Sequence, residues 1–319
     1  MRFLRGDYNG KLFAIDPHRI NTYSKRIMPA KKSKPGSRSK KILQTFFCIN
    51  AITGQPVAFT IGSSGKTASG AALELVDMMK DIVPQGGLFM ADTEHASVDI
   101  FKKFKETENY EVLMPMSNTE KIIKYMKELK YKRQWAGYSL STGTYPFGRK
   151  NMLINLISQR IGEIKSKYKY KVFGSTSLHS RDKQMKMLTE DYPKRWTIEE
   201  FFNFEAAMGW DKASTMNLNI RYGKMSLALI AQAATYQLRK KLPEPYKNWT
   251  AKHLADTIFH GIDGDLKIKK DTIIVTLYNI PEKLKLKKHY ENLPDKLLKE
   301  GINPRIPWLY NFKIDFRFK

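Results

Sequence analysis

Two aspartates each follow directly after a short apolar segment of the chain. Asp16 comes after Leu12–Ile15, and Asp92 comes after Gly87–Ala91. If these segments are neighbouring strands, both carboxylates lie at one edge of a sheet. There they could hold Mg²⁺, which prefers carboxylate oxygens and bridges to phosphate. A single aspartate at a strand end is more often a turn or helix-cap residue, so the pair alone leaves both interpretations open.

The surrounding chain is strongly basic, which makes an acidic pair informative. Its 319 residues include 56 Lys and Arg against 31 Asp and Glu, which gives a net charge of +25. Such a charge favours a polyanionic partner, either a nucleic acid or an anionic membrane surface. Two acids would repel a nucleic acid, and a cation bound between them removes that conflict. The composition therefore favours a metal site facing a nucleic acid.

Several classes of protein are excluded by other features of the sequence. The longest mainly apolar segment, Met225–Leu238, is too short to cross a bilayer, which takes roughly 20 apolar residues. The chain does not open with a basic segment followed by an apolar one, as a secretion signal would. A single cysteine, Cys48, excludes an internal disulfide framework and a Cys-rich zinc site. We expect a protein of the cytoplasm that neither spans nor binds a membrane.

A third acid lies in the segment Tyr192-Pro-Lys-Arg-Trp-Thr-Ile-Glu-Glu-Phe-Phe202. Thr197 and Glu200 have the spacing of a capping box, so a helix is expected to begin at Thr197. Glu200 then has a structural role, whereas Glu199 is free to point away from the first helical turn. The apolar residues that follow can anchor this turn on a sheet.

The elements that would position these acids alternate between strands and helices. Three strands come first, two of them joined by a Thr-Gly turn, and a helix, a strand, a second helix and another strand follow. This order is typical of an α/β fold with a mixed sheet. The expected elements are strands at Leu12–Ile15, Ile42–Ile49, Pro56–Ile61, Gly87–Asp92 and Tyr110–Met114, and helices at Ala68–Val83 and Ser97–Lys105.

The second half of the chain begins with a change of character. Residues 116–171 are dense in Lys and Tyr and contain a turn-rich β-forming segment, which predicts a mainly β insertion. A strand at Tyr170–Phe173, helices from Thr197 and over Met216–Lys241, and strands at Thr272–Tyr278 and Tyr310–Phe318 are expected to follow. We expect residues 1–115 and 172–245 to form one α/β domain, with residues 246–319 as an α+β extension.

A glycine-rich segment resembles a phosphate-binding loop but has the wrong spacing. Gly62-Ser-Ser-Gly-Lys-Thr67 lies between an expected strand and an expected helix. A P-loop has four residues between its glycines, so that consecutive N–H groups surround a phosphate. Here only two intervene, and Thr60 stands where the first glycine is needed. We expect a turn rather than a nucleotide site, although Lys66 could still contact DNA.

The segment around the third acid carries a resemblance to a known family. Tyr192-x-x-Arg195-Trp-x-Ile-Glu199-x-Phe-Phe resembles the signature of DDE (Asp-Asp-Glu) transposases of prokaryotic insertion sequences. Asp16 and Asp92 are similar in context to the first two acids of that family. They lie 76 residues apart, and Glu199 follows Asp92 by 107 residues. The closing segment, from Ile302 onward, also resembles such transposases, so the resemblance covers nearly the whole chain.

This resemblance implies a fold and an activity. The fold would be a ribonuclease H-like mixed sheet flanked by helices, interrupted by the β-rich insertion. Asp16, Asp92 and Glu199 would be the catalytic acids and would hold two Mg²⁺ ions, for which Mn²⁺ could substitute, to cleave and join strands at insertion-sequence ends. The implied partner is double-stranded DNA, bound near the nucleoid by a homodimer on two transposon ends. No nucleotide cofactor is implied.

Other residues would contact DNA. Tyr192 and Arg195 would bind phosphates near the cut, Arg195 through its planar fork. Trp135 or Tyr138 could stack on an unpaired base, or could equally pack the insertion's own core. The loop Ser24–Lys41 holds eight basic residues and no acid, and it is either a solvated loop or a phosphate-binding arm. Its candidate contacts are Lys31, Lys32, Arg38 and Lys40.

The sequence departs from the family pattern in two places. The family signature has a lysine seven positions after the glutamate, where this chain has Ala206, and Lys212 is the nearest substitute. Family members usually carry a DNA-binding region before the first catalytic strand, whereas only residues 1–11 precede Leu12 here. We therefore expect either a truncated or split product, or recognition of DNA ends by other surfaces. The alternative function is a catalytically idle, truncated or domesticated relative that binds nucleic acid.

Overall fold

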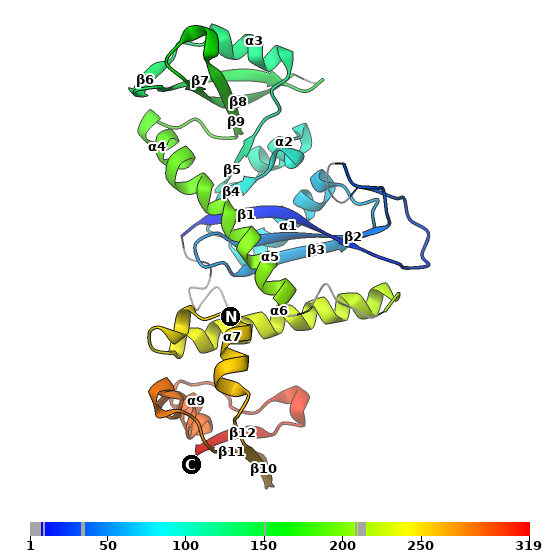
Figure 1. Ribbon diagram of the computed structural model, residues 1–319, viewed down its shortest axis with the longest axis vertical. Helices are drawn as coiled ribbons and strands as arrows, with labels where there is room; N and C mark the ends of the chain where they lie inside the picture. Colours follow the sequence, from blue (N-terminus) through cyan, green and yellow to red (C-terminus); the bar gives the residue numbers. More distant parts are fainter. Residues whose placement is uncertain (1–7, 9, 33–35, 150, 208, 210–214) are drawn as a thin grey trace. The chain divides into compact units, whose positions relative to one another are not determined.

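A computed structural model describes residues 8, 10–32, 36–149, 151–207, 209 and 215–319 (Figure 1). The chain divides into two compact units. The first consists of residues 1–203 with 214–222, and the second of residues 204–213 with 223–319. Lys212 lies outside the described residues. None of the helices in the described ranges is both long and apolar enough to span a membrane.

A nine-stranded sheet forms the frame of the first unit, in the order β3-β2-β1-β4-β5-β9-β8-β7-β6. The chain's first three strands pair antiparallel; the fourth then pairs in parallel with β1, and the fifth in parallel with the fourth. These five are β1 (Leu12–Asn21), β2 (Ile42–Asn50), β3 (Pro56–Gly62), β4 (Gly87–Ala91) and β5 (Tyr110–Pro115). The expected mixed sheet flanked by helices is confirmed.

Two helices cover this part of the sheet because their apolar faces match its aromatic surface. α1 (Ala68–Ile82) begins at Thr67 and α2 (Val98–Glu106) begins at Ser97, and each of these side chains accepts a hydrogen bond from a backbone N–H in the first turn. The Phe89 ring of β4 lies 5.2 Å from Phe13 of β1 and 5.1 Å from Phe104 of α2. The core therefore lies between β1, β4 and these helices.

The β-rich residues 116–171 extend the same sheet. After α3 (Glu120–Glu128), the strands β6 (Lys132–Trp135), β7 (Tyr138–Phe147), β8 (Met152–Ile161) and β9 (Lys169–Ser175) pair antiparallel, with a short turn η2 (Lys165–Lys167) before β9. β9 joins them to β5. A Cβ atom on Gly143 of β7 would lie 2.1 Å from the hydroxyl of Tyr125, so glycine permits the close approach of α3. The expected domain boundaries remain predictions.

One helical stretch leads to the third acid, and its last helix begins at Thr197, as the sequence predicts, but without the expected cap. α4 (Arg181–Lys186), the π-turn η3 (Met187–Asp191), the 3₁₀ turn η4 (Tyr192–Trp196) and α5 (Thr197–Ala207) follow one another without a break (Figure 1, green). Thr197 already has helical dihedral angles and is not an N-cap. Its hydroxyl donates instead to the carbonyl of Ala51, so the predicted capping box is wrong.

The second unit holds most of α6 (Leu218–Lys241) and a three-stranded sheet in the order β10-β11-β12. Its strands are β10 (Gly264–Lys269), β11 (Thr272–Leu277) and β12 (Lys313–Phe318), and its short helices and turns are η5 (Tyr246–Asn248), α7 (Ala251–Leu254), η6 (Ala255–Phe259), η7 (Glu282–Leu284), α8 (Leu286–Tyr290), α9 (Leu293–Lys299) and η8 (Pro307–Leu309). The last strand begins later than predicted, because Tyr310 and Asn311 have φ values of 49° and 58° and form a turn.

Candidate active site

Asp16 and Asp92 lie next to each other because of the register between their strands. In the parallel β1–β4 pair, Ile15 is opposite Ala91, and β4 ends there. The sequence predicted that the strand ends just before Asp16, and this is wrong. β1 continues to Asn21 through its antiparallel pairing with β2. Asp92 begins the turn η1 (Thr93–His95), where its carboxylate accepts a hydrogen bond from the Thr93 N–H at 2.6 Å.

The helical stretch brings Tyr192 and Arg195 to the same place. The Tyr192 hydroxyl donates to the carbonyl of Ala91 at 3.3 Å, directly beside Asp92. Nη1 of Arg195 lies 3.8 Å from Oδ1 of Asp16, and the two side chains are only 15% and 13% exposed. This Nη1 is buried and has no hydrogen-bond partner among the described residues.

Glu199 lies in the first turn of α5, and this helix packs on β2. Ile198 is fully buried, and the Phe201 ring lies 5.2 Å from Phe47. Phe47 is the residue opposite Asp16 in the β1–β2 pair. The apolar residues around Glu199 therefore fix the helix beside the strand that carries Asp16, as the sequence predicted.

The electrostatic environment of Asp16 links all three acids. The pKa of Asp16 is raised to about 7, chiefly by burial; Arg195 lowers it, and the charges of Glu199, Asp92 and Glu94 raise it. Burial likewise raises the pKa of Tyr192 to about 12. Asp16 is therefore costly to ionise in the folded protein, mainly because it is buried.

The carboxylates of Asp92 and Glu199 are close enough to Asp16 to shift its pKa, but the three acids do not form a coordination sphere for a metal ion. Within the described part of the chain, no three His, Cys, Asp or Glu side chains are grouped closely enough to hold a metal ion. The donors themselves are all carboxylate oxygens, the type that Mg²⁺ and Mn²⁺ prefer.

Three residues near the acids, Glu94, Arg19 and His95, are not among the candidates named from the sequence. Glu94, in η1, forms an ion pair with Arg19 of β1. Next to it, His95 is completely buried, and neither ring nitrogen has a hydrogen-bond partner among the described residues. Burial lowers the pKa of His95 to about 4. The Glu94–Arg19 pair joins residues 75 positions apart, so no local pattern signals it.

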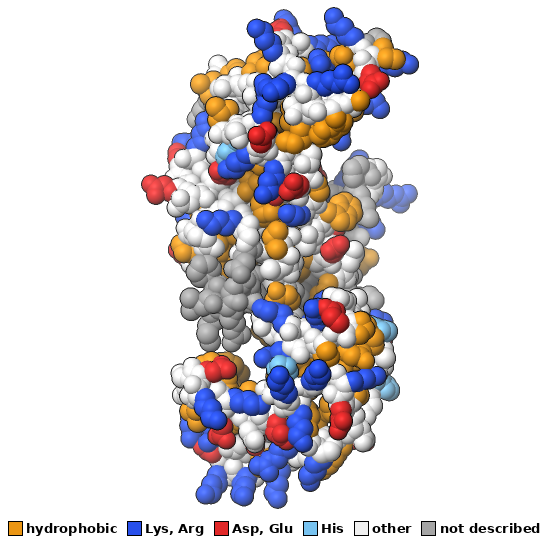
Figure 2. All heavy atoms as spheres, turned by 90° about the vertical axis from the view of Figure 1, so that its left-hand side faces the viewer, with side chains coloured by type: hydrophobic (Ala, Val, Ile, Leu, Met, Phe, Trp, Pro, Cys, Tyr) orange, Lys and Arg blue, Asp and Glu red, His pale blue; other side chains and the backbone are white. Residues whose placement is uncertain are grey.

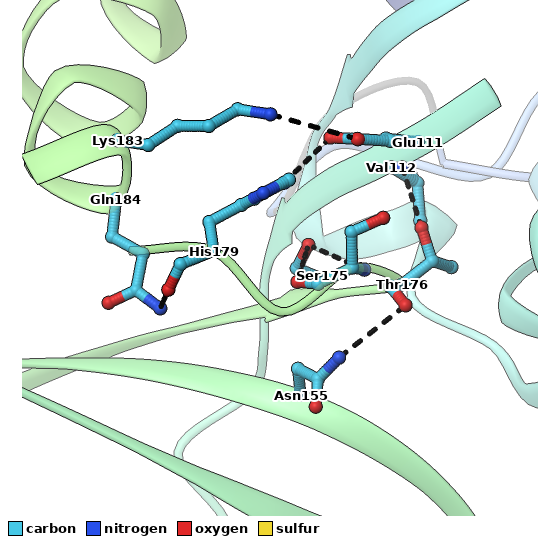
Figure 3. A network of polar contacts seen from close by, with 9 residues as sticks. Glu111, Val112, Asn155, Ser175, Thr176, His179, Lys183 and Gln184 are labelled. Atoms are coloured by element: carbon cyan, nitrogen blue, oxygen red, sulfur yellow. Dashed lines mark hydrogen bonds and ion pairs between the residues drawn. The ribbon is translucent and has the colours of Figure 1, made fainter. Parts of the chain in front are cut away.

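A polar network anchors the start of the helical stretch (Figure 3). His179 Nε2 lies 2.8 Å from a carboxylate oxygen of Glu111 on β5, and Lys183 of α4 points to the other oxygen at 3.9 Å. The Gln184 side chain donates to the carbonyl of His179 at 2.9 Å. These contacts tie α4 to the sheet, so the helix that carries Arg195 and Glu199 is held near both ends.

The predicted DNA contacts are spread over the first unit. Lys31 and Lys40 exchange two backbone hydrogen bonds, at 2.8 and 2.9 Å, so the basic loop has a defined hairpin stem. Lys32, Arg38 and Lys40 are exposed. Lys66 instead pairs with Glu74 and Thr60, which gives it a structural role. Lys and Arg side chains are spread over the face in Figure 2.

Trp135 lies at the end of β6, and its ring stacks on Tyr138 at a centroid distance of 4.3 Å and an interplanar angle of 9°. Trp135 is 51% exposed. One face of the indole is therefore covered by the insertion's own tyrosine.

Two transposase complexes are among the solved structures to which this chain is similar. Among solved structures, the chain resembles the piggyBac transposase synaptic complex with hairpin DNA, with 13% identity and a TM-score of 0.44 over 78% of this chain. It spans about half, 53%, of that chain. It also resembles the Mos1 transposase paired-end complex with left transposon end, with 16% identity and a TM-score of 0.23 over 35% of this chain and 37% of that chain.

No curated protein matches the sequence. The family described as "Transposase DDE domain" matches residues 8–233, which include Asp16, Asp92 and Glu199. That match covers more than half of the chain. The chain therefore belongs to the transposase DDE domain family.

Proposed function

We propose that this chain is a DNA transposase that cleaves and joins strands at insertion-sequence ends, with Asp16, Asp92 and Glu199 as its catalytic acids. The observation that carries the proposal is the environment of Asp16. Asp92 and Glu199, which are distant from it in sequence, both raise its pKa. Membership of the transposase family supports the same conclusion.

The acids are suited to Mg²⁺ or Mn²⁺. A carboxyl group whose pKa stands near 7 in a cluster of acids has its negative charge best compensated by a cation. Asp16, Asp92 and Glu199 would hold the metal after their side chains rearrange to bring the carboxylate oxygens together. When bound, two such ions activate the attacking oxygen and stabilise the leaving oxygen at a phosphodiester.

The chain's own residues would orient the DNA strand. Arg195, whose side chain is 15% exposed and lies beside Asp16, would bind a phosphate oxygen through the exposed part of its guanidinium. Tyr192 fixes the backbone beside Asp92 through its bond to Ala91. The chain's charge of +25 and the exposed cations of the loop Ser24–Lys41 would hold the rest of a duplex.

The wider assembly follows from the same proposal. A homodimer would hold two transposon ends, since cutting and joining act on both ends of an element. Residues 116–171 would be the insertion, between residues 1–115 and 172–245 of the catalytic domain, with residues 246–319 as the extension.

The decisive experiment measures nicking of DNA that carries the sequences flanking the gene. Purified protein and Asp92→Asn are compared in Mg²⁺, in Mn²⁺ and in EDTA, each with and without ATP. We expect nicking that needs the metal, ignores ATP and falls at least about 10³-fold in the variant. Tight, salt-sensitive DNA binding without nicking in either metal would instead favour the idle binding relative, which agrees with the open arrangement of the acids.

Replacing Trp135 with Ala is expected to impair strand processing more than folding. The indole is half exposed and covered on one face only, so its loss removes little core packing. A base stacked on an aromatic ring gains about 1–3 kcal/mol, which corresponds to roughly 5- to 150-fold in strand processing. Nicking and thermal unfolding are measured side by side, and an equal loss of both would show that Trp135 only packs the insertion.

A further inference from the structure

A fourth carboxylate, that of Glu94, lies close to two of the proposed catalytic acids, Asp16 and Asp92. Glu94 is two residues after Asp92, in η1, and its charge raises the pKa of Asp16. Its side chain is 44% exposed, so it can reorient. Because carboxylates are the ligands that Mg²⁺ and Mn²⁺ prefer, a free Glu94 would compete with the catalytic acids for the cation.

Arg19 forms an ion pair with Glu94. Nη2 of Arg19 binds Oε1 of Glu94 across the space between β1 and η1. Arg19 also donates through Nε to Oε1 of Gln44, at 3.4 Å, on the neighbouring strand. The Gln44 side chain is buried and donates to the carbonyls of Lys66 and Ser64, at 2.6 and 3.1 Å. Arg19 is therefore held in place by a chain of hydrogen bonds before it meets Glu94.

The turn that carries Glu94 is the one that follows Asp92. The N–H of His95 donates to the carbonyl of Asp92 at 3.0 Å, and the N–H of Ala96 donates to Thr93 at 3.0 Å. His95 is fully buried beneath this turn. The ion pair with Arg19 joins Glu94 to β1, the strand that carries Asp16. It therefore also fixes the short segment that follows Asp92.

We propose that Arg19 is a positioning residue of the catalytic site, which holds Glu94 away from the cation and keeps the turn behind Asp92 in register with Asp16. The proposal rests on the proposed function, because it assumes that the acids bind a divalent cation. Residues that orient metal ligands indirectly typically affect metal affinity or activity by 10–100-fold. The contribution of such an exposed pair to folding is small by comparison.

The test uses the full-length protein and two readouts, Mn²⁺ binding by electron paramagnetic resonance and nicking at saturating Mn²⁺. Arg19→Ala should bind Mn²⁺ at least as tightly as the wild type, because it frees a carboxylate and removes a positive charge. It should nevertheless nick about 10-fold more slowly, because the freed carboxylate misplaces the cation. Adding Glu94→Gln should return the rate to within about 5-fold of the wild type.

Two further variants complete the design. Glu94→Gln alone keeps a hydrogen-bond acceptor for Arg19 and should bind Mn²⁺ and nick within about 5-fold of the wild type. Lys103→Ala is the matched control, because it removes the cation of another ion pair in the same unit, with Asp77 at 2.6 Å, and neither residue is among those that shift the pKa of Asp16. Its rate and its Mn²⁺ affinity should not change.

Each contrary result identifies what has failed. Wild-type nicking by Arg19→Ala, or a double variant as slow as Arg19→Ala, would overturn the positioning role. Weakened Mn²⁺ binding and slow nicking in Glu94→Gln would overturn it too, since Glu94 would then be a ligand. If the wild type does not nick at all, the proposed function fails, and Mn²⁺ binding still decides the inference: Arg19→Ala must bind more tightly than the double variant.

Discussion

Asp16→Asn is expected to abolish nicking and, at the same time, to stabilise the metal-free protein above pH 7. The loss of activity should be at least about 10³-fold, because the proposed site loses its central carboxylate. The gain in stability has a separate cause. Asp16 is only 13% exposed and lies among Asp92, Glu199 and Glu94, so ionising it in the folded state is costly.

The pH range of this stabilisation follows from the two pKa values of Asp16. The folded protein holds its carboxyl proton up to about pH 7, whereas the unfolded chain loses it near the ordinary value of 3.8. Between these values the folded state binds more protons, so its free energy of unfolding falls as the pH rises. Each pKa unit corresponds to about 1.4 kcal/mol, so the cost amounts to a few kcal/mol, fully expressed above pH 7.

Urea unfolding in EDTA at pH 4 and pH 8 measures the effect. The wild type and Asp16→Asn should differ little at pH 4, and the variant should be more stable at pH 8. Asp77→Asn is the control of opposite sign, because hydrogen bonds from Lys103 and Lys80 hold the pKa of Asp77 below its usual value. Removing Asp77 should therefore cost some stability at neutral pH. An equal response of Asp16→Asn at both pH values would contradict the predicted environment.

The sheet and the meeting of the acids could be predicted because their signals are local. Apolar runs mark β1, β2 and β4, and the parallel register then places Asp92 beside Asp16. The end of β1 could not be predicted in this way. Asp16-Pro-His-Arg19 is not an apolar run, and it remains a strand because it pairs with β2, whose residues are all buried. Pairing across the sheet overrides local preference.

Two other features depend on contacts between distant parts of the chain. The spacing of Thr197 and Glu200 is that of a capping box, but the chain is already helical from Arg181. The Thr197 hydroxyl instead donates to the carbonyl of Ala51, 146 residues earlier in the sequence. The pairing of Arg19 with Glu94 likewise has no sequence signature. Both are tertiary contacts, which periodicity and spacing do not report.

Arg195→Met is expected to slow nicking by about 100-fold at pH 7, the usual cost of removing one donor to a developing charge. Arg195 lowers the pKa of Asp16, so its removal raises that pKa above its already elevated value. More Asp16 is then protonated at neutral pH, and the acidic limb of the pH–rate profile should move to higher pH.

Arg195→Lys separates the two roles of this side chain. Lysine restores a positive charge near Asp16, so the acidic limb should return toward its wild-type position. It lacks the planar fork, so the maximal rate should stay below that of the wild type. Single-turnover nicking from pH 6 to pH 9, with DNA affinity measured separately, distinguishes these effects. If Arg195→Met lowers the rate without moving the limb, Arg195 contacts phosphate but does not control the ionisation of Asp16.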